Sequence, residues 1–124
     1  KETAAARSAE MFKLFSGSHF DAAEHERRSQ LGVERSFRPE GTARQTAAIM
    51  ASPNRTSGLR NVEAPTLVIH GLMDKLVTPS GGMATARAIP HSRLLMFPDM
   101  GHDLPAPRHA EIIAAIRRNA DRAN

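Results

Sequence analysis

Two residues that could form an acid–base pair, Asp74 and His102, each follow a short apolar run. Asp74 lies four residues after the end of PTLVIH (residues 65–70), and His102 lies five residues after the end of RLLMF (residues 93–97). A carboxylate that accepts the imidazole N–H fixes the ring tautomer, so the other ring nitrogen can remove a proton from a hydroxyl. If both runs are neighbouring parallel strands, the pair predicts general acid–base catalysis at the rim of a sheet.

The elements that must position this pair are two strands and the helices that follow them. PTLVIH is almost continuously apolar and rich in β-branched residues, which is typical of a strand buried in a parallel sheet. Thr78 and Pro79 predict a helix over residues 80–88, and Asp103 is expected to cap the last helix. The order strand, helix, strand, helix predicts an α/β fold with a right-handed crossover and a doubly wound parallel sheet.

The chain is expected to have two parts. Residues 1–52 are rich in Ala, Glu and Arg and predict helices only, whereas residues 53–124 begin with loop signals and then carry the strands. Two parallel strands rarely form a stable sheet alone, because such sheets have several strands and are covered on both faces. The sequence therefore predicts one end of a larger sheet.

Composition argues against several classes of partner. The 124 residues carry a formal charge of +4 but no cysteine, Trp or Tyr. Without cysteine there is no disulfide or thiolate zinc site, which favours a reducing, cytoplasmic location. The arginines are interleaved with acidic residues and no Trp or Tyr is present to stack on bases, so we expect no nucleic-acid partner. No run approaches the ~20 apolar residues of a membrane helix, and we expect neither a secretory leader nor a membrane partner.

The segments around the two residues resemble a known superfamily. HGLMDKLV, which contains Asp74, resembles the acid loop of the α/β-hydrolases, and FPDMGHDLP, which contains His102, resembles their histidine loop. FRPEGTARQTAAIMASPNRTSGLRNVEAPTLVIHG is similar to bacterial, especially actinobacterial, carboxylesterases related to aclacinomycin methylesterase and to lactonase-like hydrolases. The resemblance covers about residues 35–120. It implies the C-terminal portion of the α/β-hydrolase fold, with its last two parallel strands in residues 53–124, preceded by a helical cap portion in residues 1–52.

The resemblance also implies a reaction. It predicts a hydrolase that cleaves a small-molecule carboxylic ester or lactone through a Ser-His-Asp triad, without a cofactor. His102 would be the general base and then the general acid, and Asp74 would orient it. Met73 and Met100 stand beside the two loops and are candidates to line a substrate pocket.

The sequence departs from the superfamily in one essential feature. The nucleophile elbow, G-x-S-x-G, is absent from these 124 residues, and so is the oxyanion-hole segment. Ser80 is flanked by Gly81 and Gly82, but it is better explained as a residue of the first helical turn. Without a nucleophile and oxyanion donors, the isolated chain is expected to be inactive. We expect its partner to be an N-terminal half that carries the serine.

Three alternatives remain open. The chain could be a truncated or split hydrolase half that is non-catalytic without its partner. It could instead belong to a haloalkane dehalogenase, with Asp in place of the serine, or to a cofactor-free haloperoxidase of the same fold. A metal site at His70, Asp74, His102 and Asp103 is the weakest interpretation, because His70 ends a strand and is expected to hydrogen-bond its neighbours. We therefore expect no metal.

Overall fold

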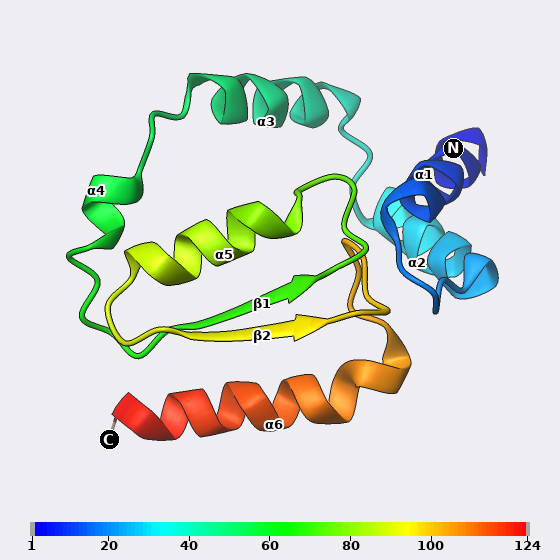
Figure 1. Cartoon of the computed structure of the whole chain (residues 1–124). Coiled ribbons are helices and arrows are strands. Elements are labelled where there is room, and N and C mark those ends of the chain that lie inside the picture. The colour runs from blue at the N-terminus through cyan, green and yellow to red at the C-terminus, as the bar shows by residue number, and fades with distance from the viewer. Residues whose placement is uncertain (1, 124) are drawn as a thin grey trace. The chain divides into compact units, whose positions relative to one another are not determined.

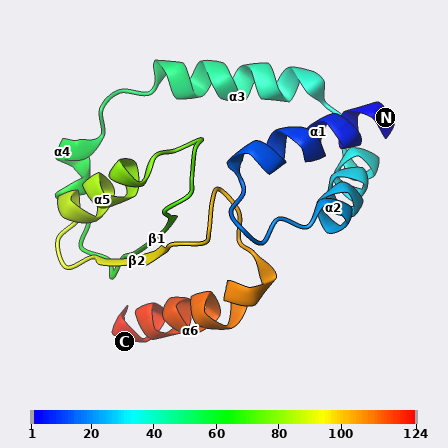
Figure 2. The same cartoon turned by 45° about the vertical axis from the view of Figure 1, so that its right-hand side comes forward.

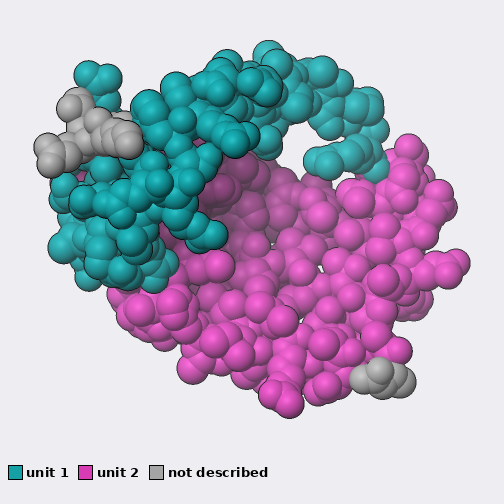
Figure 3. All heavy atoms as spheres, turned by 180° about the vertical axis from the view of Figure 1, so that it is seen from behind, with its two compact units in different colours: residues 1–12, 21–55 teal, residues 13–20, 56–124 magenta. Residues whose placement is uncertain are grey.

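The computed structural model describes residues 2–123 of the chain (Figure 1). The elements are α1 (Glu2–Phe15), α2 (Ala22–Arg35), α3 (Pro39–Ala51), α4 (Thr56–Leu59), β1 (Leu67–Gly71), α5 (Pro79–Ala88), β2 (Arg93–Phe97), the 3-10 turn η1 (Ala106–Arg108), α6 (His109–Ala120) and the 3-10 turn η2 (Asp121–Ala123). They divide into two compact units, residues 1–12 with 21–55 and residues 13–20 with 56–124, which Figure 3 shows in different colours. Among the residues described, no helix is both long enough and apolar enough to cross a membrane.

The unit of residues 1–12 and 21–55 is helical, as its composition predicts. Asp21 caps α2, because its side chain accepts a hydrogen bond from the Glu24 N–H at 2.9 Å. Glu24 in turn pairs with Arg27 and Arg28, and the hydrogen bonds from these two guanidinium groups lower the pKa of Glu24 to about 2. These local contacts explain why a strongly charged segment is helical. The assignment of residues 1–52 to a cap stays a prediction.

The second unit contains a two-stranded parallel sheet, as expected from the order of its elements. β1 pairs with β2 in parallel, with Leu67 opposite Arg93 and Gly71 opposite Phe97. Figures 1 and 2 show α5 and α6 on opposite faces of this sheet. The predicted helix over residues 80–88 is confirmed as α5, which begins at Pro79. Within the described chain, the fold is thus a partial α/β arrangement.

A small core lies between the sheet and α6. Phe97, Met100 and Ile112 are buried together, and Ile69 and Leu95 pack against them. Ile69 and Leu95 are register partners, and Leu95 and Phe97 lie two residues apart on one strand, so all three point to the same face. This cluster anchors the start of the loop that carries His102.

The expectation that Asp103 caps the last helix is wrong. Its carboxylate oxygen Oδ1 accepts hydrogen bonds from the backbone N–H groups of Gly17 and Gly101 instead. α6 begins only at His109, after η1. Pro107 lacks an N–H and disfavours helical geometry in the residue before it, so the regular helix starts beyond it.

Candidate active site

The loops that follow β1 and β2 leave the sheet at the same rim and bond directly to each other. The Leu72 N–H donates to the Phe97 carbonyl at 2.9 Å, and the Met73 N–H donates to the Met100 carbonyl at 3.0 Å. A methyl group on Gly71 would overlap the backbone carbonyls of Met100 and Gly101. The first loop therefore lies against the second with no intervening side chain.

This arrangement brings Asp74 and His102 together. Their side chains are joined at 2.8 Å between His102 Nδ1 and Asp74 Oδ2. The other carboxylate oxygen, Oδ1, accepts the N–H groups of Leu76 and Val77, each at 2.9 Å. The Asp74 side chain is only 4% exposed, whereas the His102 side chain is 41% exposed. The acid is therefore buried and fixed, and the imidazole reaches the surface.

The ionised state of Asp74 defines the tautomer of the neutral imidazole. Burial raises the pKa of Asp74, but hydrogen bonds from Val77, His102 and Leu76 outweigh it and hold the pKa below its ordinary value. Asp74 is therefore ionised at neutral pH and can only accept hydrogen bonds. In the neutral imidazole, Nδ1 of His102 must then carry the proton, which leaves the lone pair on Nε2. Nε2 makes no hydrogen bond to residues 2–123, so it is available to a ligand hydroxyl.

His70 supports the acid, and the expectation that it hydrogen-bonds its neighbours is confirmed. Its Nε2 lies 2.8 Å from the Val77 carbonyl and 3.6 Å from Asp74 Oδ2. A carbonyl only accepts, so Nε2 donates this hydrogen bond. The bond fixes the turn at Leu76 and Val77, whose N–H groups bind Asp74. α5 packs closely on this ring, because a methyl group on Gly82 would lie 2.6 Å from His70 Nδ1. A histidine inside a buried apolar strand needs a polar partner, which is why the sequence predicts a hydrogen bond; the structure adds that the partner is the Val77 carbonyl.

The other predicted site residues lie in different environments. Met73 is 40% exposed, and its sulfur accepts a hydrogen bond from the Ser18 hydroxyl at 3.3 Å. Met100 is 2% exposed and is part of the core, although its carbonyl holds the Met73 backbone. Ser80 is in the first turn of α5 and bonds to the Thr78 hydroxyl at 2.8 Å. Of these side chains, that of Met73 is the one open to a ligand beside the acid–base pair.

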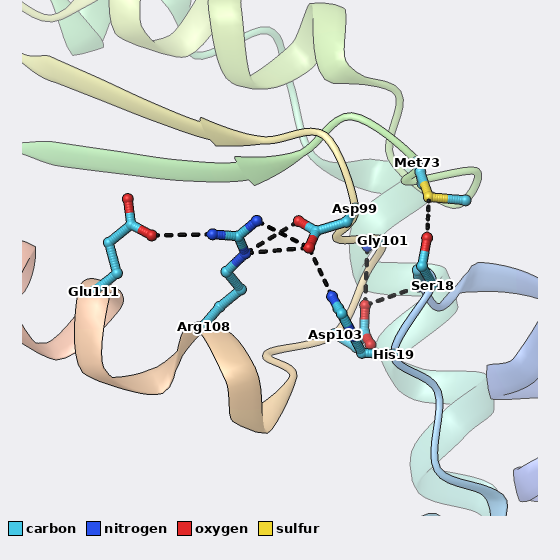
Figure 4. A network of polar contacts seen from close by, with 9 residues as sticks. Ser18, His19, Met73, Asp99, Gly101, Asp103, Arg108 and Glu111 are labelled. Atoms are coloured by element: carbon cyan, nitrogen blue, oxygen red, sulfur yellow. Dashed lines mark hydrogen bonds and ion pairs between the residues drawn. The ribbon is translucent and has the colours of Figure 1, made fainter.

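A network of charged residues surrounds the start of the histidine-bearing loop (Figure 4). Asp99 accepts hydrogen bonds from the Arg108 guanidinium at 2.9 to 3.2 Å and from His19 Nε2 at 2.6 Å. Arg108 also pairs with Glu111, and its guanidinium lies 5.1 Å from the centre of the Phe97 ring. The bonds from Arg108 and then His19 lower the pKa of Asp99 to about 2.

Asp99 should make the stability of this unit depend on pH. An aspartate in the unfolded chain has a pKa of about 3.9. Between about pH 4 and pH 2 the unfolded chain therefore binds more protons than the native one. The stabilising effect of Asp99 is therefore present above pH 4 and is lost as the pH falls towards 2. Urea unfolding followed by circular dichroism should show a smaller loss of stability over this interval for Asp99→Asn than for the wild type. Asp121→Asn, which changes an exposed residue outside the network, should match the wild type. An unchanged slope for Asp99→Asn would contradict the assignment.

The described residues of the candidate site form no arrangement typical of a metal centre. Among residues 2–123, no group of three or more His, Asp or Glu side chains is placed to hold a metal ion. The side chains nearest to such a set, His70 and His102, both face Asp74 through one nitrogen each. The geometry is that of an oriented imidazole.

Comparison with known proteins identifies relatives of this chain. No protein-family model matches it. It is 48% identical over 50 residues to a protein named as the non-heme bromoperoxidase BpoC of Mycobacterium tuberculosis, across 40% of the chain and 19% of that protein. It is 29% identical over 112 residues to the rhodomycin D methylesterase DnrP of Streptomyces peucetius, across 89% of the chain and 38% of that protein.

These relatives confirm the resemblance that the sequence motifs predict. Both are α/β-hydrolase enzymes, and their source organisms agree with the expected likeness to actinobacterial esterases, at low identity. They support a hydrolase-type enzyme at the level of the superfamily. The chain spans less than two fifths of the length of either relative.

Proposed function

We propose that this chain supplies the acid and the base of a Ser-His-Asp hydrolase that cleaves carboxylic ester or lactone bonds. The observation that carries the proposal is the 2.8 Å bond between His102 Nδ1 and the buried Asp74 carboxylate at the carboxyl rim of a parallel sheet. In this proposal residues 53–124 are the C-terminal part of an α/β-hydrolase core, and residues 1–52 are part of its helical cap.

The proposed reaction follows from the state of the imidazole. His102 Nε2 accepts the proton of the serine hydroxyl as the serine oxygen attacks the ester carbonyl, and the buried Asp74 carboxylate stabilises the imidazolium formed. The imidazolium then gives this proton to the departing alkoxide. In the second half-reaction, His102 takes a proton from the water that attacks the acyl-enzyme; the bond between the serine oxygen and the acyl carbon breaks, the imidazolium returns its proton to the serine oxygen, and the carboxylic acid leaves. No cofactor is needed for these steps.

The nucleophile in this proposal comes from a segment outside these 124 residues. The sequence contains no G-x-S-x-G, and the relatives are much longer than the matched regions. Leu94 of β2 is 41% exposed although it belongs to an apolar strand, which supports contact with further structure. We propose an N-terminal half that carries the serine and the oxyanion donors, and that the chain is inactive as an esterase without it.

The substrate we propose has a substantial apolar part. Exposed apolar side chains accompany the acid–base pair on the two loops: Leu72, Met73, Leu76, Val77 and Leu104. Apolar side chains beside a few polar groups are typical of small-molecule sites. Met73 is our candidate for direct contact with the substrate. Met100 was a second candidate; its side chain is in the core, so we propose that it acts through the carbonyl that holds Met73.

A second candidate function is that of a cofactor-free haloperoxidase. The similarity to BpoC favours it, since that protein is named as a non-heme bromoperoxidase. Bromination of a phenol by hydrogen peroxide and bromide would separate the two: an esterase without this activity excludes the haloperoxidase. A dehalogenase would show Asp in place of the nucleophilic serine.

The proposal is tested by the composition and activity of protein purified from its natural source. We expect a G-x-S-x-G sequence in the same polypeptide or in a second chain that co-purifies, detected by intact mass and peptide sequencing. This material should hydrolyse p-nitrophenyl esters and react at serine with a fluorophosphonate probe. The isolated 124-residue chain should do neither. Hydrolysis by the isolated chain, or an active preparation that lacks the motif, would contradict the proposal.

The same assay tests the role of Met73. Met73→Ala removes an exposed apolar side chain beside the acid–base pair, so we expect the preference between short and long acyl chains to change by about tenfold. Met11→Ala changes an exposed methionine in the other unit and is the matched control. An acyl preference for Met73→Ala identical to that of the wild type would remove Met73 from the pocket.

A further inference from the structure

We infer that Asp103 is a positioning residue for His102, because it fastens an upstream segment onto the loop that carries the imidazole. We call residues 15–19 the strap and residues 99–103 the histidine loop. The inference rests on the proposed function in giving His102 a catalytic role. The contacts that carry it lie within one compact unit of the chain.

The strap and the histidine loop are joined through their backbones. The His102 N–H donates to the Phe15 carbonyl at 2.6 Å, and the Ser18 N–H donates to the Asp99 carbonyl at 2.9 Å. Such bonds hold the position of the main chain whatever the side chains do. The residues joined are more than eighty positions apart in sequence.

The side chain of Asp103 adds a further connection between the strap and the histidine loop. Its Oδ1 accepts the Gly101 N–H at 2.9 Å (Figure 4). The same oxygen accepts the Gly17 N–H at 3.1 Å, so one carboxylate oxygen bridges the loop and the strap. Two successive peptide N–H groups are then fixed. The Gly101 N–H donates to the Asp103 carboxylate, and the His102 N–H donates to the Phe15 carbonyl. With the backbone fixed, only the side-chain torsions of His102 remain free, and the bond to Asp74 determines those.

Two glycines make this close approach possible. A methyl group on Gly101 would overlap the Phe15 carbonyl and lie 2.6 Å from the Gly17 nitrogen. A methyl group on Gly17 would overlap the Asp99 carbonyl and lie 2.7 Å from the Gly101 nitrogen. Only glycine leaves room for two backbones at this distance. The Asp103 bridge is therefore specific to a chain with glycine at both positions.

The charged network of Asp99 holds the other end of the same contact. Asp99 is bonded to His19 of the strap and to Arg108 before α6. Its carbonyl also receives the Ser18 N–H. The strap is thus attached at both ends of the histidine loop, by Asp99 at the start and by Asp103 at the end. Asp103 is the attachment adjacent to the imidazole, which is why we assign the positioning role to it.

The test uses the polypeptide or complex that contains these 124 residues, labelled with 15N, and it needs no ester. In Asp103→Ala we expect the backbone amides of His102 and Gly17 to exchange with solvent at least tenfold faster than in the wild type. We also expect the downfield Nδ1–H proton signal of His102, which reports the bond to Asp74, to broaden or disappear. The amides of Ile69 and Leu95 in the sheet should keep their protection. Asp121→Ala, an exposed aspartate of the same unit, is the control and should change none of these.

A conservative variant separates positioning from general stability. Asp103→Asn keeps the size of the side chain and an oxygen acceptor, so it should retain the His102 Nδ1–H signal and exchange within about threefold of the wild type. Wild-type exchange and an unchanged His102 signal in Asp103→Ala would overturn the inference. If the sheet amides of Asp103→Ala also lose their protection, Asp103→Asn decides the question. Retained protection of the His102 amide in Asp103→Asn supports the positioning role. Loss of that protection in Asp103→Asn while the sheet amides stay protected overturns it. Because no catalysis is measured, failure here is distinct from failure of the proposed hydrolase activity.

Discussion

Asp74→Asn should lower kcat for ester hydrolysis by about ten-thousandfold in the nucleophile-containing enzyme, while the fold and the position of His102 are kept. The N–H groups of Leu76 and Val77 both point at Oδ1 and will hold the amide oxygen there. The amide NH₂ group must then occupy the Oδ2 position and donate to His102 Nδ1. This forces the proton of the neutral ring onto Nε2. Nε2 then has no lone pair with which to accept the proton of the serine hydroxyl. Initial rates with a p-nitrophenyl ester measure the effect.

Two controls make this loss of activity specific. Asp121→Asn makes the same chemical change at an exposed position of the same unit and should leave kcat within twofold of the wild type. Asp74→Asn should also slow labelling by a fluorophosphonate, because the serine is no longer activated. Activity of Asp74→Asn within about tenfold of the wild type would show that Asp74 does not orient a catalytic imidazole.

Gly71→Ala should destabilise the unit of residues 13–20 and 56–124 by about 3 kcal/mol. The added methyl group would overlap the carbonyls of Met100 and Gly101. These are backbone atoms, so the overlap can be relieved only by moving the histidine loop away from β1. That movement stretches the hydrogen bonds that Leu72 and Met73 donate to this loop and separates His102 from Asp74. Urea unfolding at neutral pH measures the change.

A glycine in an open position provides the matched control. Gly32 lies inside α2, and a methyl group there meets no atom within 4 Å. Gly32→Ala should therefore be neutral or stabilise its helix by about 0.5–1 kcal/mol, because alanine restricts the unfolded chain and favours the helix. Gly71→Ala with a free energy of unfolding within 1 kcal/mol of the wild type would contradict the close contact at the rim.

The regular elements and the direction of the sheet could be predicted because their causes are local. The apolar run before Asp74 and the run RLLMF are strands, and the Thr78–Pro79 pair begins a helix, as side-chain period and turn residues indicate. Parallel strands send their following loops to one rim. The expectation that Asp74 and His102 approach each other therefore needed only the order of the elements, and their bonded geometry agrees with it.

The sequence by itself determined the two strands and the residues that could act as acid and base, since these depend on neighbours within a few positions, and it determined the parallel order of the strands through the helix that connects them. Only the tertiary structure decided how that pair is held. The burial of Met100 in the core, the bond from His70 to Val77, and the use of Asp103 as a bridge to Gly17 all depend on which segments meet in space. Asp103 shows the reason most clearly: alone it has the local features of a helix cap, but its carboxylate accepts a hydrogen bond from a backbone N–H more than eighty residues away. Contacts of that range follow no period along the chain, so they become visible only when the chain is folded.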